Sequence, residues 1–127
     1  MERPKFLRDR AVITCDKEGV GLTFTHWLRR RYSWRLSWQD IQALEAMVVE
    51  VPCFELGFVL HTKERRYFIS DDMENWSTAM SLVKENFHDF DWAAVKVAQK
   101  FENRNKPILC WKRAPSAPAA ERNGIGQ

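Results

Sequence analysis

The chain has 127 residues, with 20 Lys and Arg against 17 Asp and Glu, so its formal net charge is only +3. Its hydrophobic fraction of 45% is ordinary for a folded domain and excludes a disordered chain or a collagen-like repeat. The three cysteines lie far apart and form no CxxC pair, which excludes a disulfide-rich miniprotein and a zinc knuckle. We therefore expect one domain at 11–113, followed by a disordered tail rich in Pro, Ala and Gly at 114–127.

Residues 1–10 form a charged lead-in to this domain. They lack the apolar core of roughly 7–15 residues that a signal peptide carries. No stretch of the sequence approaches the roughly 18 apolar residues of a membrane-spanning helix. The cysteines are also expected to be unpaired, which is typical of a reducing compartment. The sequence therefore predicts a cytoplasmic protein without a transmembrane segment.

The next part of the sequence predicts antiparallel strands. Ala11–Cys15 and Val20–Thr25 are rich in Val, Ile, Thr and Phe, and the polar loop between them ends in Gly19, as in a β-hairpin. In Tyr32–Leu36 large apolar side chains alternate with Ser and Arg, which is the period of a half-buried strand.

The pattern between residues 41 and 51 fits two structures. Ile41, Leu44, Val48 and Val51 keep helical spacing, and Ser37–Asp40 resembles a helix-capping box. The same segment is rich in β-branched residues, which lower helix propensity and favour a strand. The local pattern alone leaves helix and strand open.

A second hairpin follows. Phe54–Leu60 alternates strictly, and a polar turn at 62–65 joins it to a strand at Arg66–Ile69. The period then changes to three and four, which predicts an amphipathic helix at about 71–87, with Ser70 as its cap and an apolar stripe of Met73, Trp76, Met80, Val83 and Phe87.

The last part of the domain predicts a shorter helix and a strand. The helix is expected at about 91–100, with Trp92, Val95 and Phe101 facing inward. Pro107–Trp111 is expected to be the final strand.

This order of strands followed by a capped helix, together with the stretch Trp38–Leu44, resembles the pleckstrin-homology-like (PH-like) superfold. A nearer likeness is to small bacterial proteins of that plan, a group without an established activity. The resemblance implies an α+β fold in which a bent antiparallel sheet, or partly open barrel, is capped by an amphipathic C-terminal helix, with a short second helix and a final strand. It also implies that Ile41–Val51 is a strand that pairs with Phe54–Leu60.

The resemblance does not extend to lipid binding. Phosphoinositide-binding PH domains carry Lys and Arg around their first hairpin loop. Here Asp16–Gly19 holds two acids and one base, so we do not expect a phosphoinositide ligand.

The most unusual local feature is the segment His26–Arg35, which holds four Arg and three aromatic residues. Guanidinium groups pair with carboxylates and phosphates, and aromatic rings anchor interfaces or stack on bases. The segment is therefore a solvated loop, or it contacts an acidic protein, a nucleic acid or an anionic membrane. The residues that we predict to bind a protein partner are Trp27, Arg29, Arg30, Arg31 and Arg35.

An acidic stretch follows this segment. Residues 36–62 hold four acids and no Lys or Arg. Glu45, Glu50 and Glu55 either lie singly on a solvated sheet face or form an acidic stripe opposite the arginines.

No motif for catalysis, metal binding or cofactor binding occurs in the sequence. His26, His61 and His88 have no metal-ligand spacing, and no phosphate-binding or nucleophile-elbow motif is present. The paired acids, Asp71 with Asp72 and Asp89 with Asp91, fit a helix N-terminus and a loop. We expect no catalytic residue, no metal and no cofactor; an enzyme would require a deep pocket lined by converging titratable groups.

We therefore expect a non-enzymatic interaction module for a protein partner with an acidic surface. The resemblance to bacterial chains adds an immunity- or secretion-associated role. The alternative is a nucleic-acid-binding domain that uses the arginine and aromatic segment together with Arg104, Lys106, Lys112 and Arg113. The sequence does not specify an oligomeric state.

Overall fold

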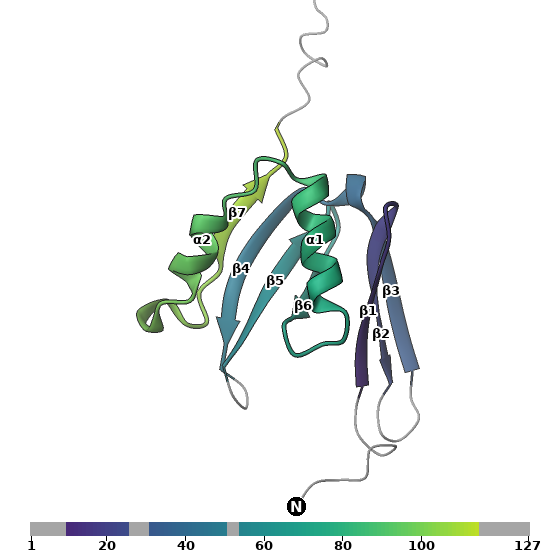
Figure 1. Cartoon of the computed structure of the whole chain (residues 1–127), viewed down its shortest axis with the longest axis horizontal. Helices are drawn as coiled ribbons and strands as arrows, with labels where there is room; N and C mark the ends of the chain where they lie inside the picture. The colour runs from purple at the N-terminus through teal and green to yellow at the C-terminus, as the bar shows by residue number, and fades with distance from the viewer. Residues whose placement is uncertain (1–9, 26–30, 51–53, 115–127) are drawn as a thin grey trace, which may run out of the picture.

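A computed structural model of the chain describes residues 10–25, 31–50 and 54–114. The structure is α+β, as expected, and strands precede and follow its helices (Figure 1). The elements within these residues are β1 (Arg10–Cys15), β2 (Gly19–Thr25), β3 (Arg31–Ser37), the 3-10 turn η2 (Trp38–Asp40), β4 (Ala43–Val49), β5 (Glu55–His61), β6 (Arg66–Ser70), α1 (Trp76–Asn86), α2 (Trp92–Ala98), the 3-10 turn η3 (Phe101–Asn103) and β7 (Ile108–Lys112).

The strands form two antiparallel sheets, one in the order β1-β2-β3 and the other in the order β6-β5-β4-β7. Within the described residues no strand of one sheet pairs with a strand of the other, so the expected barrel is not closed. A bulge interrupts the β4–β7 pairing: Leu44 lies opposite Trp111 and Glu45 lies opposite Leu109, which leaves Cys110 as the extra residue.

The two sheets enclose a core with α1 between them (Figure 1). Aromatic side chains tie the layers together. The Phe58 ring of β5 lies 5.5 Å from the ring of Trp76 on α1, and Phe87, just after α1, lies 4.4 Å from Trp111 on β7. The largest fully buried apolar side chains come from both sheets and the turn between them: Phe58, Ile13, Ile41, Leu44, Leu60, Ile69 and Val20.

The segment with two possible structures is a strand. β4 pairs with β5 over its whole length, as the resemblance implied, and η2 forms the turn that precedes it. Long-range contacts decide this. The indole of Trp38 donates to the Asp16 carbonyl at 2.8 Å, and the guanidinium of Arg113 donates to the Ile41 carbonyl at 2.9 Å. These bonds fix both ends of the turn, so helical spacing in the sequence is overruled by tertiary structure.

The first helix begins later than predicted. α1 starts at Trp76, and Ser70 is the buried last residue of β6, where its hydroxyl donates to Asp72 at 2.6 Å, so the predicted cap is wrong. Met73 packs against the core from the turn before the helix, which is why its spacing looked helical. Asn75 precedes the helix in a left-handed conformation with φ 72°.

The second helix is also shorter than predicted, and two of its expected inward side chains are exposed. Val95 is buried as expected, but Trp92 is 37% exposed and Phe101 is 67% exposed. Asp91 starts the helix, because its carboxylate accepts from the backbone N–H groups of Ala93 and Ala94. Phe101 lies after the helix in η3, where its ring contacts Phe54 and Arg104.

Candidate interaction site at the open edge of β3

The predicted partner-binding residues fall in two groups. Trp27, Arg29 and Arg30 lie outside the described residues. Arg31 and Arg35 lie on β3, where both are exposed. The structure therefore describes the C-terminal half of the arginine and aromatic segment as a strand rather than a loop.

Alternation along β3 separates its side chains into two faces. Trp34 and Leu36 turn inward, and the Trp34 ring lies 4.6 Å from the ring of Tyr67 on β6. Arg31, Ser33 and Arg35 turn outward and are exposed. Tyr32, on the same face as Trp34 and Leu36, is 59% exposed and lies 5.9 Å from the ring of Phe24, so this exposed ring is on the opposite face of the strand from Arg31 and Arg35.

Arg35 already has a carboxylate partner. Its guanidinium donates to Asp16 Oδ1 at 2.7 Å. The same oxygen accepts from the backbone N–H groups of Glu18 and Gly19, and these bonds, first that from Glu18 and then the Arg35 guanidinium, hold the pKa of Asp16 below its usual value. Both side chains are about half exposed, so the pair is a weak one that an incoming carboxylate can displace.

The main chain of β3 has one free edge. Beyond the end of the β2–β3 ladder, the N–H of Trp38 donates to the Glu18 carbonyl at 3.3 Å. Bonded and non-bonded pairs alternate in an antiparallel ladder, so Tyr32, Trp34 and Leu36 bond to β2. The N–H and C=O groups of Arg31, Ser33 and Arg35 point to the other side, where no strand pairs with them among the described residues.

The free edges of the molecule differ in how they are covered. At β1, the N–H of Ile13 donates to Glu74, and the N–H of Glu74 donates to Ala11, at 3.0 and 3.1 Å. At β7, the carbonyl of Cys110 accepts from the N–H of Asp91 at 2.9 Å, and α2 packs alongside. Within the described chain no backbone bond covers the edge of β3, and β6 is covered only at its end, where the N–H of Met73 donates to the Ser70 carbonyl at 3.1 Å. The rings of Trp34 and Tyr67 are in contact between the two strands. We call this uncovered junction the open seam.

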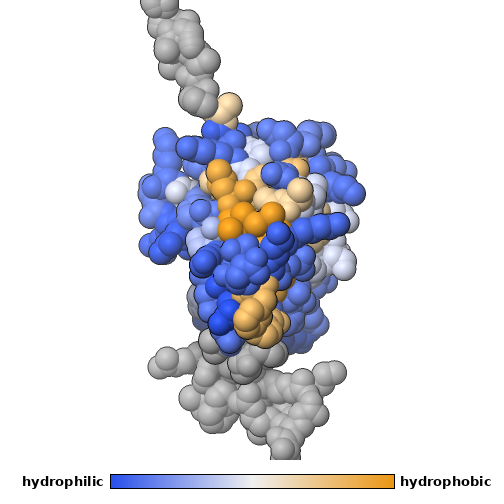
Figure 2. Space-filling view, turned by 90° about the vertical axis from the view of Figure 1, so that its left-hand side faces the viewer, coloured by the Kyte–Doolittle hydropathy of each residue, from blue (hydrophilic) through white to orange (hydrophobic). Residues whose placement is uncertain are grey.

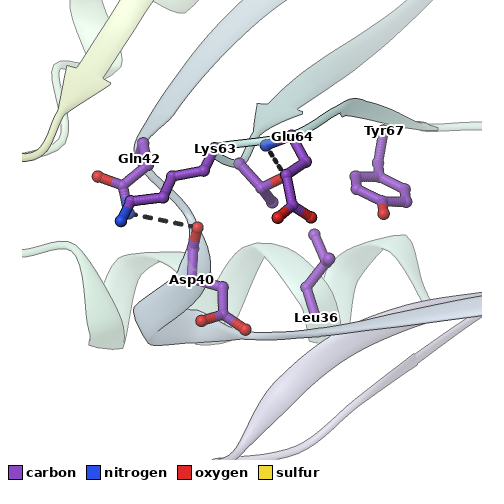
Figure 3. Close-up of a pocket in the computed structure, with 7 residues that line it drawn as sticks. Leu36, Asp40, Gln42, Lys63, Glu64 and Tyr67 are labelled. Atoms are coloured by element: carbon purple, nitrogen blue, oxygen red, sulfur yellow. Dashed lines mark hydrogen bonds between the residues drawn. The ribbon is translucent and has the colours of Figure 1, made fainter.

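A pocket of about 390 Å³ lies at the end of the open seam. Figure 3 shows that the residues around it come from separate elements: Leu36 ends β3, Tyr67 lies on β6, and Asp40 and Gln42 flank it from the turn before β4. Lys63 and Glu64 reach it from the β5–β6 turn. Its lining includes the apolar surface of Leu36 and Tyr67 and side chains of both charges, which suits a polar side chain better than a large apolar ligand.

Two further surface features lie elsewhere. A pocket of about 300 Å³ is lined mainly by Val48, Phe54, Leu56 and Phe101, and the guanidinium of Arg104 lies 4.1 Å from the centre of the Phe101 ring. The side of the molecule with α2 and β7 shows a hydrophobic patch among hydrophilic residues (Figure 2), and Val97 on α2 and Leu109 on β7 are exposed. Nothing in the structure indicates what covers either feature.

The acidic residues of the middle strands do not act as one stripe. Glu45 bonds to His61 at 2.7 Å across β4 and β5, whereas Glu50 pairs with Arg104 at 3.3 Å. Glu55 lies near Asp72 and Ser70, and burial followed by the Asp72 charge raises its pKa. Each glutamate has separate neighbours, so the interpretation as single residues fits better than an acidic surface opposite the arginines.

The cations expected for nucleic-acid binding are partly engaged within the protein. Arg104 stacks on Phe101 and pairs with Glu50, and half-buried Arg113 donates to the carbonyls of Trp38 and Ile41. Lys106 and Lys112 are exposed. Two of the four predicted cations therefore stabilise the fold.

The described residues hold little reactive chemistry. Burial raises the pKa of the Cys110 thiol to about 11, and burial followed by the Asp16 charge raises that of Cys15, so both thiols are protonated and weakly nucleophilic at neutral pH. Asp89 accepts from the Trp111 indole at 2.8 Å, and Asp91 caps α2. Across residues 10–25, 31–50 and 54–114, no three His, Cys, Asp or Glu side chains converge as a metal site would require.

No helix in the described ranges is both long and apolar enough to cross a lipid bilayer. No family model, curated protein or solved structure matches the chain. The geometry of β3 and the open seam therefore carries the functional argument.

Proposed function

We propose that the protein is a non-enzymatic interaction module and that it binds a protein partner with an acidic surface through β3. The exposed residues Arg31 and Arg35, on one face of an edge strand that no described strand pairs with, carry this proposal. Arginine is enriched at protein interfaces, because guanidinium groups pair with carboxylates in fixed geometry.

The surroundings of β3 favour an anionic partner. Lys63, Arg65 and Arg66 are exposed across the open seam, with Glu64 as the acid among them. Arg35 is already paired with Asp16, so a partner's carboxylate would replace this weak, half-exposed ion pair. The adjacent Trp27, Arg29 and Arg30 extend the same composition along the sequence.

The fold assignment and cellular setting belong to the same proposal. We propose a PH-like architecture for the two sheets and α1, in a cytoplasmic bacterial protein with an immunity- or secretion-associated role. Two sheets packed about a helix after β6 support the architecture, although the open seam departs from a closed barrel. The acidic Asp16–Gly19 loop argues against a phosphoinositide ligand.

Nucleic-acid binding is the alternative. Exposed Arg31 and Tyr32 favour it, since a guanidinium pairs with a phosphate while a ring stacks on a base, although strand alternation places the two side chains on opposite faces of β3. The engagement of Arg104 and Arg113 within the fold weakens it. Such binding would decrease steeply with salt.

A capture experiment tests the proposal. The full chain, immobilised and exposed to a nuclease-treated bacterial lysate, is compared with the double variant Arg31→Glu/Arg35→Glu. The matched control is Lys96→Glu/Lys100→Glu, which reverses two exposed charges on the α2 side. We expect acidic proteins to be captured by the parent and the control and to be lost from the β3 variant.

Two results would count against the proposal. Equal capture by all three proteins would show that β3 takes no part in it. Binding of a single-stranded oligonucleotide at low salt, lost in the same β3 variant while no protein is captured, would favour the nucleic-acid alternative.

A further inference from the structure

At the open edge of β3, main-chain groups that no other described residue bonds lie beside outward-facing arginine side chains. Arg31, Ser33 and Arg35 present their N–H and C=O groups on the side away from β2, and their side chains on the outer face. We define these three residues, with their main-chain groups, as the arginine edge. Unpaired strand edges are templates for another strand, and proteins usually blunt them.

The two sheets show that this chain does cover edges elsewhere. Glu74 bonds to both Ile13 and Ala11 along β1, and Asp91 bonds to Cys110 on β7. Exposed arginines at β3 protect it against neutral or basic strands, but not against an acidic one. The edge of β3 is therefore open to pairing with an acidic strand and disfavours other strands.

From this we infer that the partner contributes an extended, acidic strand that adds to β3 beside the arginine edge. The inference rests on the proposed function and specifies its binding mode. Main-chain bonds to Arg31, Ser33 and Arg35 supply the pairing, and carboxylates directly opposite the two arginines supply the selectivity.

The spacing of the arginines defines the sequence that fits. Arg31 and Arg35 are four residues apart on one face, or roughly 13 Å along a strand. An added strand therefore needs acidic residues at positions i and i+4, with the positions between them facing the same way as Ser33 also polar. The pocket beside Leu36 and Lys63 lies at the C-terminal end of this edge, where it can receive a polar side chain from the end of the strand.

The probe is a capped ten-residue peptide of alternating threonine and glutamate, added to the full chain. Backbone amide exchange is followed by NMR. We expect saturating peptide to slow the exchange of the Arg31, Ser33 and Arg35 amides at least about tenfold, because each gains a hydrogen-bond acceptor. The amides of Tyr32 and Trp34, which already bond to β2, should change little.

Two matched changes separate strand pairing from simple charge attraction. The first is the same peptide with N-methyl groups on alternate residues, which keeps every charge but removes donors from one edge. The second is Ser33→Pro against Ser33→Ala: proline removes an N–H that faces outward and is compatible with an edge strand. We expect the methylated peptide to bind at least about tenfold more weakly, and Ser33→Pro to lose more affinity than Ser33→Ala.

The outcomes distinguish this inference from the proposed function. Peptide binding that disappears in Arg31→Glu/Arg35→Glu but ignores N-methylation would overturn strand addition and leave an acidic partner in place. Lack of peptide binding, together with capture that β3 charge reversal does not alter, would overturn both.

Other occupants of the edge have their own signatures in the same experiment. Protection of the Arg31, Ser33 and Arg35 amides that rises with protein concentration, without peptide, would identify a second copy of the chain and overturn the inference. An alternating threonine–lysine peptide should not protect these amides, and protection by it would show that the arginines confer no selectivity.

Discussion

The two edge strands of the three-stranded sheet, β1 and β3, differ in their surroundings. Along β1 the turn before α1 supplies two backbone hydrogen bonds, and Arg10 adds a bond to Glu74 at 2.8 Å. Along β3 the described chain supplies none, and arginine side chains stand beside the free main-chain groups. In the second sheet α2 packs beside β7, whereas within the described residues β6 is covered only at Ser70, whose carbonyl accepts from the N–H of Met73.

The difference follows from where the helices lie. α1 and α2 both come after β6 in the sequence. The turn that leads into α1 runs beside β1, and α2 packs beside β7 (Figure 1). The side with helices is thereby packed and its edges are covered, whereas the open seam is held by the Trp34–Tyr67 contact. Stability is expected to reside on the helical side and recognition on the open side, so substitutions on the two sides should separate.

The largest effect is expected from Phe58→Ala. The Phe58 side chain is 1% exposed and lies between the rings of Trp76 and Phe90, so its removal leaves a cavity under α1. We expect a loss of about 3–5 kcal/mol in the free energy of unfolding, measured by urea denaturation. Tyr32→Ala on the open side is the control, with a loss below about 1 kcal/mol. Equal losses would contradict the division between the two sides.

A smaller effect is expected where the chain covers β1. Asn75 has φ 72° and donates from its side-chain amide to the Ile13 carbonyl at 2.9 Å. Asn75→Ala removes this bond and leaves alanine, which tolerates the left-handed backbone less well than asparagine does, for a loss of about 2 kcal/mol in the free energy of unfolding. Asn75→Gly removes the bond but accepts the backbone, so about half of that loss is expected. Identical unfolding midpoints for the two variants would show that the left-handed conformation carries no cost.

The cover of β7 offers a weaker test. In Asp91→Ala, the N–H groups of Ala93 and Ala94 lose their carboxylate acceptor at the start of α2. The expected loss in unfolding free energy is about 1 kcal/mol. Asp91→Asn preserves the acceptor and should retain most of the stability. In hydrogen exchange, the Ala variant should open α2 without changing β3, and faster exchange in β3 would contradict the separation.

The smallest effect on stability is expected from removing the charge of Glu55, which lies near Ser70 at the end of β6. Burial and the Asp72 charge raise the pKa of Glu55, so the folded state favours the protonated acid. This contribution to stability is complete below the unfolded pKa of glutamate and is lost as pH rises through the folded value. Glu55→Gln should therefore stabilise the protein at pH 7 by less than about 0.5 kcal/mol, because the group is partly solvated.

The Glu55 prediction is checked by urea midpoints at two pH values. The difference between Glu55→Gln and the parent should disappear near pH 3.5, where the parent carries the proton in both states. Glu64→Gln, at an exposed position of the β5–β6 turn, should show no comparable gain. A gain in the free energy of unfolding from Glu55→Gln that persists near pH 3.5 would contradict this prediction, because it would not come from the ionisation of Glu55.

Much of the strand pattern is predictable from sequence because burial on one face leaves a period of two. β3 follows this rule over residues 33–37. In β5, Phe58 and Leu60 are buried where alternation places them, but Gly57 and Val59 on the other face are buried too. The local sequence does not decide whether β4 is a strand or a helix, because long-range bonds such as that from Arg113 to Ile41 determine its structure. The strand is predicted only by the resemblance to the PH-like superfold. The alternation of apolar and polar side chains predicts a strand, but it does not predict which strands lie beside it.

The remaining errors have physical causes. The left-handed backbone of Asn75 leaves no apolar signal, so the helix seemed to start at residue 71. Phe101 looks like a core residue by composition, yet Arg104 and Phe54 supply a contact surface for it outside the core. The open edge of β3 was predictable only as a run of arginines, because edge exposure depends on which segments pack beside the strand.

The bulge in β7 has a consequence for insertions and deletions. A regular strand alternates its side chains, but Cys110 and Trp111 are consecutive and both buried, because the extra residue restores the pairing of Trp111 with Leu44. Removing one residue here would move either the thiol or the indole out of the interior and would separate Trp111 from Asp89. We therefore expect β7 to tolerate neither the insertion nor the deletion of a single residue. The exposed turn at 62–65 has no such constraint on its length.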